Sequence, residues 1–148
     1  MIPRFGASPD PARRYRLRPG AYAILPRAGR VLLTVQYDDT DDIQLPGGGI
    51  DPGESPRTAL FREVVEETGW AIAAPRRIGA FRRFVFMPEY DLWAEKLCHI
   101  YVARPTRRIG PPSEPDHAPL WMPVADAARA LANPGDRAML RRYAAGSP

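Results

Sequence analysis

The feature that most constrains this chain is the segment 46–70, PGGGIDPGESPRTALFREVVEETGW, in which a run of glycines precedes a cluster of glutamates. Ser55 is a favourable helix N-cap, and Pro56 suits the first helical position, where a missing N–H costs nothing. Gly69 suits the left-handed residue that commonly follows a helix. These signals predict a helix over residues 56–68, placed shortly after a glycine turn.

Viewed down the helix axis, each residue is rotated by about 100° from the one before it. On this helical wheel, three glutamates, Glu63, Glu66 and Glu67, fall within one arc of about 100°. Arg62 borders the acidic arc and can reach Glu66 at the i, i+4 spacing. The apolar stripe that we expect to face the core is separate and contains Leu60, Phe61, Val64, Val65 and Thr68. The helix is therefore predicted to have one buried face and one face of concentrated negative charge.

The acidic face needs a physical explanation, because like charges at these spacings destabilise a helix by roughly 0.2–0.5 kcal/mol per pair. A hard divalent cation such as Mg²⁺ would compensate them, since it takes oxygen ligands and commonly joins protein carboxylates to substrate phosphates. The glycines at positions 47–49 allow a backbone to approach such a metal or phosphate closely. A solvated acidic surface is the alternative interpretation of the glutamates taken alone.

Composition limits the classes of protein to consider. The chain has 148 residues, of which 45% are hydrophobic and 26% charged, and this suits a single globular core. It has no apolar run of membrane-spanning length, no secretory signal and a single cysteine, Cys98, so we expect a cytoplasmic protein without an internal disulfide. The net charge of +4 comes almost entirely from arginine, which favours an anionic, phosphate-bearing partner, although a general compositional bias is the alternative.

The rest of the chain predicts one domain of mixed strands and helices. Residues 1–16 are rich in Pro and Arg without periodicity, which favours a loose N-terminal arm before a domain spanning residues 17–148. We expect strands in GAYAIL, RVLLTVQ, DIQLP, WAIAA, RRIGAFRRFVF, KLCHIYVAR and LWMPV, and helices in ADAARALAN and DRAMLRRYAA. The segments MPEYDLWAE and PTRRIGPPSEPDHAP are expected to be an exposed loop and an irregular connection.

The complete spacing of the glycine and glutamate segment resembles the Nudix box at every fixed position: Gly48, Glu54, Arg62, Glu63, Glu66, Glu67 and Gly69. Trp70 stands where an aliphatic residue is more usual, but it retains bulk and apolarity. The resemblance implies an α/β fold, a Nudix-type α/β/α sandwich around a mixed β-sheet in a single domain. It also implies a Mg²⁺-dependent hydrolase, with Mn²⁺ as an alternative metal, that cleaves a nucleoside diphosphate linked to another group.

The resemblance also implies roles for individual residues. By position, Glu63, Glu66 and Glu67 correspond to the metal ligands, with a backbone carbonyl of Gly47 or Gly48 as a further ligand. In the same way, Arg62 corresponds to the residue that orients the glutamates, and Glu54 corresponds to a partner that supports the site from outside the ligand set.

The general base that takes a proton from the attacking water is left open by the sequence. Glu63 is the first choice within the box, and Glu114 in PPSEPDH is the leading choice downstream. Asp116 and His117 follow Glu114, and Glu95 comes after them. The alternative interpretation of Glu114 is an ordinary solvent-exposed acid of a proline-rich loop.

The substrate is less constrained, because substrate selection lies outside the box. Family members specialised for ADP-ribose or for diadenosine polyphosphates favour a proline or a tyrosine at positions occupied here by Val85 and Met87, so neither specialisation is supported. Nucleoside di- or triphosphates are the default. An RNA 5′ end processed by the same chemistry and a non-catalytic nucleotide-sensing module are the alternatives.

Aromatic and arginine side chains are the candidates for binding the substrate, because aromatic faces stack on bases and guanidinium groups pair with phosphates. They are Arg82, Arg83, Tyr90 and Trp93, with Tyr22, Phe84 and Arg27 as further candidates. Cys98 and His99 lie in an expected strand, where structural roles are the better interpretation. We expect no membrane partner; a homodimer is possible, and the sequence does not determine the oligomeric state.

Overall fold

The larger of two β-sheets forms the middle of the molecule. The computed structural model describes residues 1–38 and 40–146. The strands of this sheet run in the order β5-β1-β7-β6 and comprise β1 (Arg16–Ile24), β5 (Gly47–Gly49), β6 (Trp70–Met87) and β7 (Leu92–Arg108). Strands β1 and β7 are parallel, whereas β1 with β5 and β6 with β7 are antiparallel. The sheet is therefore mixed, as predicted.

A smaller antiparallel sheet is built around β3 (Arg30–Gln36). Its other strands are β2 (Pro26–Arg27), β4 (Asp42–Gln44) and β8 (His117–Pro123), all paired with β3. The pairing of β3 with β8 brings the chain back from the loop at residues 109–116 to the middle of the domain. This return places the start of β8 beside the glycine strand β5 and the helix that follows it.

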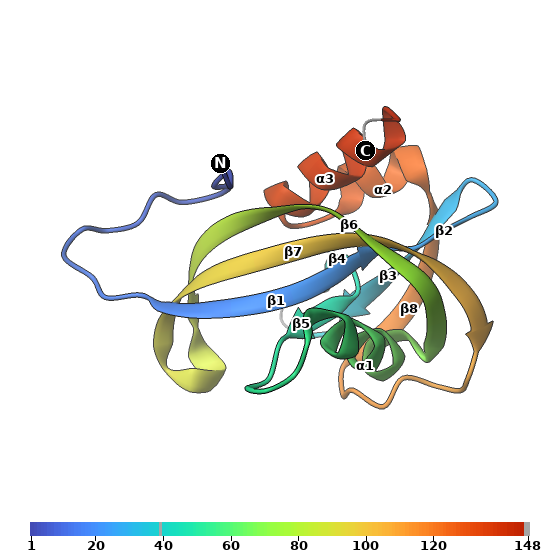
Figure 1. Cartoon of the computed structure of the whole chain (residues 1–148), viewed down its shortest axis with the longest axis horizontal. Coiled ribbons are helices and arrows are strands. Elements are labelled where there is room, and N and C mark those ends of the chain that lie inside the picture. The colour runs from blue at the N-terminus through green and yellow to red at the C-terminus, as the bar shows by residue number, and fades with distance from the viewer. Residues whose placement is uncertain (39, 147–148) are drawn as a thin grey trace.

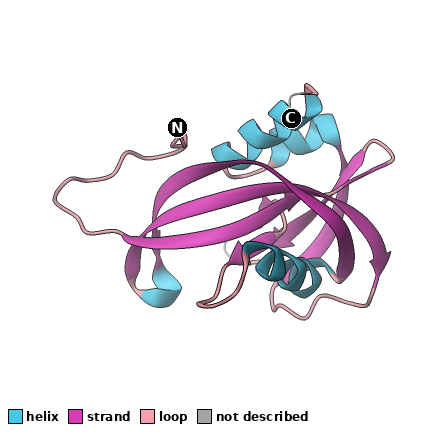
Figure 2. Ribbon diagram, in the orientation of Figure 1, coloured by secondary structure: helices cyan, strands magenta, loops and turns pink. Residues whose placement is uncertain are grey.

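Helices cover the large sheet on both sides. Helix α1 (Pro56–Thr68) lies on one side, and α2 (Val124–Ala130) and α3 (Pro134–Ala144) lie on the other (Figures 1 and 2). A short 3₁₀ turn, η1 (Pro88–Tyr90), joins β6 to β7. The predicted α/β/α arrangement is confirmed. Among the described residues, no helix has both the length and the hydropathy needed to span a membrane.

Two apolar clusters hold these layers together. One lies between the sheets and the C-terminal helices and includes Ile24, Phe81, Ile100 and Leu140. The other lies under α1 and includes Ala21, Leu32, Leu60, Val64 and Tyr101. Cys98 belongs to the first cluster, which agrees with its expected structural role. Successive residues of β1 alternate between the two clusters because side chains of a strand point to opposite faces.

Helix α1 begins and ends at the predicted residues. The Ser55 side chain accepts a hydrogen bond from the N–H of Thr58, and Gly69 adopts a left-handed φ of 77°. The predicted apolar stripe is wrong at one position, because Phe61 is 39% exposed. Glu67 is only 8% exposed and packs with the buried residues of the helix. The acidic face is therefore split between one buried glutamate and two at its rim.

Other differences from the expected elements concern the two long strands. The segments WAIAA and RRIGAFRRFVF form one continuous strand, β6, with register shifts between residues 71 and 79. The segment PTRR was expected to be irregular but forms the end of β7, where Arg108 pairs with Trp70. Pairing with the start of β6 therefore overrides the preference of this proline-containing segment for irregular structure.

The N-terminal residues form neither a helix nor a long strand, as their lack of periodicity suggests. They are nevertheless attached to the edge of β6. The N–H of Phe5 donates to the Arg82 carbonyl at 3.0 Å, the N–H of Arg82 donates to the Pro3 carbonyl at 2.9 Å, and the rings of Phe5 and Phe81 meet edge to face. Pro3 and Phe5 of the expected arm thus contact the large sheet.

Candidate active site

The glycine strand β5 lies directly over the end of helix α1, and this brings Glu67 under it. The N–H of Gly47 donates to Glu67 Oε1 at 3.0 Å. Burial raises the pKa of Glu67 to about 8, and repulsion from Glu63, Glu114 and Glu66 acts in the same direction. Glu67 therefore lacks the positive charge that would stabilise its ionised form.

A glycine is needed at position 48 because the carboxylate of Glu63 fills the space that a side chain at this position would occupy. A Cβ at Gly48 would lie 2.6 Å from Glu63 Oε2, and a Cβ at Gly47 would collide with the Ala21 carbonyl. Burial also raises the pKa of Glu63, although Arg62 opposes this shift. The glycines thus allow the backbone of β5 to lie against the carboxylates of Glu63 and Glu67, whereas the sequence predicts an approach to a metal or phosphate.

Arg62 connects the acidic residues around the mouth of the site. Its guanidinium bonds both oxygens of Glu54 at 2.8 Å, and it reaches Glu63 at 2.9 Å and Glu66 at 3.3 Å. The hydrogen bonds from Arg62 lower the pKa of Glu54 to about 2. The i, i+4 contact with Glu66 agrees with the helical wheel, and a further ion pair with Asp51 at 3.5 Å was not anticipated. Arg62 holds the rim glutamates in place but has no described contact with Glu67.

The proline-rich loop between β7 and β8 is fixed to the C-terminal end of α1. The N–H of Glu114 donates to the Glu66 carbonyl at 2.8 Å, and that of Ile109 donates to the Gly69 carbonyl at 2.7 Å. These bonds bring the Glu114 side chain to a cavity that Glu63 and Glu67 also line. Both expected general bases, Glu63 and Glu114, therefore face the same space, and their roles remain predictions.

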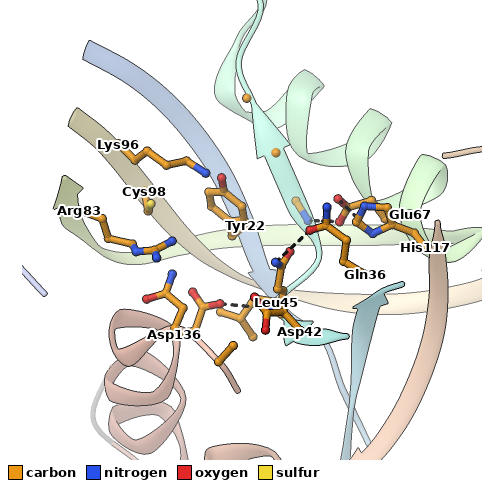
Figure 3. A pocket seen from close by; sticks show the side chains of 16 residues that line it. Tyr22, Gln36, Asp42, Leu45, Glu67, Arg83, Lys96, Cys98, His117 and Asp136 are labelled. Atoms are coloured by element: carbon orange, nitrogen blue, oxygen red, sulfur yellow. Dashed lines mark hydrogen bonds and ion pairs between the residues drawn. The ribbon is translucent and has the colours of Figure 1, made fainter. Parts of the chain in front are cut away.

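Two adjoining cavities of about 290 Å³ each surround Glu67. The first cavity is lined by Tyr22, Arg83, Lys96, Cys98, Asn133 and Asp136, and Figure 3 shows its strand and helix side chains facing one another. The second cavity is lined by Arg18, Glu63, Met87, Tyr90 and Glu114. Tyr22, Gly49, Glu67 and Lys96 line both. The two cavities thus form one elongated site with Glu67 at the junction.

The far end of the first cavity contains a second buried acid, Asp136. It is 4% exposed, and its Oδ2 accepts a hydrogen bond from the N–H of Leu45 at 3.3 Å. Burial raises the pKa of Asp136 to about 6, while the charges of Arg83 and Lys96 oppose this shift. At neutral pH Asp136 is therefore mainly an anionic hydrogen-bond acceptor on the cavity wall.

The donor atoms at the Glu67 end suit a hard divalent cation. Glu63, Glu66 and Glu67 offer carboxylate oxygens, and burial disfavours the ionised forms of two of them unless positive charge is added. Among the described residues no three acidic, histidine or cysteine side chains form a complete metal cage. Mg²⁺ does not require one, because it usually keeps several waters and binds one or two carboxylates together with substrate phosphates.

The expected substrate residues divide between the cavities and the rest of the surface. Arg83 lines the first cavity, Tyr90 the second and Tyr22 both. Arg82 and Trp93 lie outside both cavities, contrary to expectation, because successive side chains of a strand point to opposite faces.

The residues outside the cavities have structural partners instead. Arg82 pairs with Glu95 at 3.3 Å, and Glu95 lines neither cavity. Trp93 packs with Phe86 and under the Arg13 guanidinium. Arg27 stacks on Trp70 and Trp121, so the unusual tryptophan at the end of the box belongs to a surface stack.

The sequence does not point to several residues that line the cavities, among them Arg18, Lys96, Asn133 and Asp136. Lys96 is the only lysine of the chain, and Asn133 caps helix α3 by accepting a hydrogen bond from Gly135. The capping pattern NPGD could have signalled the start of α3 near residue 134. It could not have signalled that this helix start faces Lys96 across a cavity.

Comparison with known proteins agrees with this geometry. Residues 14–143 match the family model of the NUDIX domain. An 8-oxo-(d)GTP phosphatase of Mycolicibacterium smegmatis is 32% identical over 103 residues, covering 70% of this chain and 30% of that protein. An RNA pyrophosphohydrolase of Dinoroseobacter shibae is 52% identical over 78 residues, covering 52% of this chain and 47% of that protein. The chain spans half or less of the length of these curated relatives.

The fold also matches a solved structure. A NUDIX hydrolase from Nitrosomonas europaea matches with a TM-score of 0.72 at 18% sequence identity. The match covers 89% of this chain and 91% of that chain. At this level of identity the likeness concerns the fold alone.

Proposed function

The chain belongs to the Nudix family, and we propose that it is a pyrophosphohydrolase acting on nucleoside triphosphates that carry a guanine-type base. We propose Mg²⁺ as its metal, with Mn²⁺ as the alternative, and the cytoplasm as its location. The observation that carries the proposal is the pair of adjoining cavities with Glu67 at their junction. One end of the site offers carboxylates for a metal and phosphates, and the other offers a buried acceptor for a base.

The phosphate end combines groups of opposite charge. Glu63, Glu66 and Glu67 would hold the divalent ion, which when bound supplies charge neutralisation and Lewis acidity to the reaction. Arg18 lines the second cavity, where its charge suits the outer phosphates. Arg62 keeps Glu63 and Glu66 oriented and also binds Glu54, so the carboxylates are positioned before the substrate arrives.

The reaction is a displacement at phosphorus. A water oxygen forms the new bond to phosphorus while the bond from phosphorus to the bridging oxygen breaks, and the bridging oxygen leaves with the departing phosphate group. The water proton passes to a carboxylate, for which Glu63 and Glu114 are the candidates that line the second cavity.

The base end supports a guanine-type nucleotide. Asp136 offers an anionic acceptor to a base that presents N–H donors, as guanine does with its ring N–H and its amino group. Arg83 and Lys96 offer donors on the same cavity wall, which suit the carbonyl oxygen of such a base. The Mycolicibacterium smegmatis relative is named for action on 8-oxo-(d)GTP, which has a base of this class.

An RNA 5′ end is the second candidate substrate. The Dinoroseobacter shibae relative is named an RNA pyrophosphohydrolase and shares 52% identity over the aligned segment. A triphosphate at an RNA end presents the same linkage to the same carboxylates. The two candidates differ in whether nucleotides beyond the first improve the substrate.

A phosphate-release assay tests these alternatives. We expect Mg²⁺-dependent hydrolysis, with kcat/KM higher for GTP, dGTP or 8-oxo-dGTP than for ATP, CTP and UTP. A short 5′-triphosphorylated RNA that is hydrolysed with higher kcat/KM than every free nucleotide would assign the RNA function instead. Tight nucleotide binding without turnover of any substrate would assign a sensing module and overturn the enzymatic proposal.

A further inference from the structure

Thr34, His117 and Glu67 form a row of polar side chains beside the first cavity. His117 Nδ1 lies 3.0 Å from Thr34 Oγ1 and 3.7 Å from Glu67 Oε2. Figure 3 shows the carboxylate of Glu67 next to the His117 ring. The other oxygen of Glu67, Oε1, accepts the hydrogen bond from the N–H of Gly47. Both carboxylate oxygens therefore have a neighbouring nitrogen.

The backbone fixes the position of the His117 ring. His117 is the first residue of β8 and pairs with Gln36 of β3. The preceding residue is held as well, because the Asp116 carbonyl accepts a hydrogen bond from the N–H of Tyr37 at 2.6 Å. Thr34 is fully buried, and the His117 side chain is 9% exposed. The row is thus part of the packed wall between the small sheet and α1.

Hydrogen-bond chemistry limits how these three groups can interact. A threonine hydroxyl can donate or accept, whereas an ionised carboxylate can only accept. A neutral imidazole carries hydrogen on one of its two nitrogens. An Nδ1 lone pair would repel an ionised Glu67, whereas an Nδ1–H attracts it. Binding of a cation by Glu67 therefore favours the tautomer with hydrogen on Nδ1.

We propose that His117 is a positioning residue for Glu67, with its Nδ1–H directed at both Thr34 Oγ1 and Glu67 Oε2. Together with the Gly47 N–H it holds the Glu67 carboxylate in one orientation toward the divalent ion. This inference rests on the proposed function, because the ion is the metal proposed there. Partners of this kind typically change metal affinity by about 10–100-fold when they are removed.

Manganese binding to the free protein, followed by electron paramagnetic resonance, tests the proposal without relying on catalysis. We expect His117→Leu to weaken Mn²⁺ binding by about 10-fold or more. His117→Asn places a side-chain N–H where Nδ1–H was, and it should keep the affinity within about threefold of the wild type. The matched control is His99→Leu, which changes the other histidine of the chain, a residue that contacts Arg77 and lines neither cavity.

A nitrogen-15 spectrum of the wild-type histidines in the presence of Mg²⁺ keeps the proposal testable if His117→Leu does not fold. The signal that remains in His99→Leu belongs to His117, and we expect it to report hydrogen on Nδ1. Hydrogen on Nε2 would overturn the proposal, and so would unchanged Mn²⁺ affinity in His117→Leu combined with a raised KM for nucleotide. Wild-type protein that binds Mn²⁺ but hydrolyses nothing would overturn the proposed function while leaving the effect of His117 measurable.

Discussion

Two buried carboxylates, Glu67 and Asp136, line the same cavity in similar local settings. Each accepts one backbone hydrogen bond, Glu67 from Gly47 at 3.0 Å and Asp136 from Leu45 at 3.3 Å. Burial is the main cause of a raised pKa in both, to about 8 for Glu67 and to about 6 for Asp136. They differ in the sign of the charges around them.

Glu67 is surrounded by other acids, Glu63, Glu66 and Glu114, whereas the charges near Asp136 are those of Arg83, Lys96 and Arg137. A carboxylate among acids ionises readily only when a cation is added. A carboxylate among cations is partly compensated and can accept hydrogen bonds from a neutral partner. The same functional group can thus serve metal binding at one end of a cavity and recognition of a base at the other.

Among the substitutions that test this contrast, replacement of Glu67 should reduce the catalytic rate most. Glu67→Gln keeps the shape of the side chain and an acceptor for the Gly47 N–H but removes the charge. We expect kcat with Mg²⁺ to fall by about 10²–10⁴-fold, because both metal binding and proton transfer depend on ionised carboxylates here. Steady-state hydrolysis of the best nucleotide measures the change.

The control for this substitution is Glu95→Gln, which removes an acid that pairs with Arg82 outside both cavities. It should leave kcat within about twofold of the wild type, as expected for a surface ion pair. If Glu67→Gln retained comparable activity, Glu67 would not be a ligand of the catalytic metal.

Gly48→Ala should have the next largest effect, because it acts on the carboxylate end alone. The added Cβ would lie 2.6 Å from Glu63 Oε2, so the Glu63 carboxylate must move. We expect kcat/KM to fall by about 10–100-fold, as for a misplaced catalytic group. The control is Gly110→Ala, since a Cβ there meets nothing within 4 Å and the residue lines neither cavity. Equal activities of the two variants would show that the close approach of Gly48 to Glu63 is unimportant.

The carboxylate end could be predicted from the sequence because its information is local. Helix α1, its caps and the contact between Arg62 and Glu66 all follow from residues within one turn or two of each other. The resemblance to the Nudix box added two residues that lie outside the glutamate cluster, Glu54 and Gly48, to the predicted site. The burial of Glu67 was missed because it depends on where β5 lies, which no helical wheel contains.

The base end could not be predicted in the same way. Asp136, Lys96 and Leu45 come from three distant parts of the chain, and only the packing of α3 against the sheet brings them together. The sequence offers both Arg82 and Arg83 as substrate-binding candidates, but only Arg83 lines a cavity. Register shifts between residues 71 and 79 change which face a given residue of β6 presents, so alternation along this strand could not be counted from its start.

Asp136→Asn should affect selectivity more than rate, since Asp136 lies away from the carboxylates that hold the metal. The amide replaces one acceptor with a donor, which suits a base with a ring acceptor such as adenine. We expect the ratio of kcat/KM for guanine over adenine nucleotides to fall by about tenfold, with kcat for each little changed. A parallel fall for both nucleotides would indicate a structural role and contradict base recognition by Asp136.

The smallest effect concerns the pH dependence of stability in the metal-free protein. The pKa of Asp136 is near its model-peptide value of about 3.8 in the unfolded chain and about 6 in the folded one, so the unfolded chain loses its proton first as the pH rises. Stability contributed by the protonated carboxyl is therefore complete below about pH 4 and is lost as the pH rises to about 6. The full shift corresponds to about 3 kcal/mol, and hydration from the cavity should reduce it to about 1 kcal/mol.

Asp136→Asn removes this loss of stability. Urea unfolding should therefore show that the free energy of unfolding of the wild type falls by about 1 kcal/mol relative to that of the variant between pH 4 and pH 7. A constant difference between the two proteins over this range would mean that Arg83 and Lys96 compensate the buried charge completely, and the contrast with Glu67 would then be sharper than the pKa of Asp136 indicates.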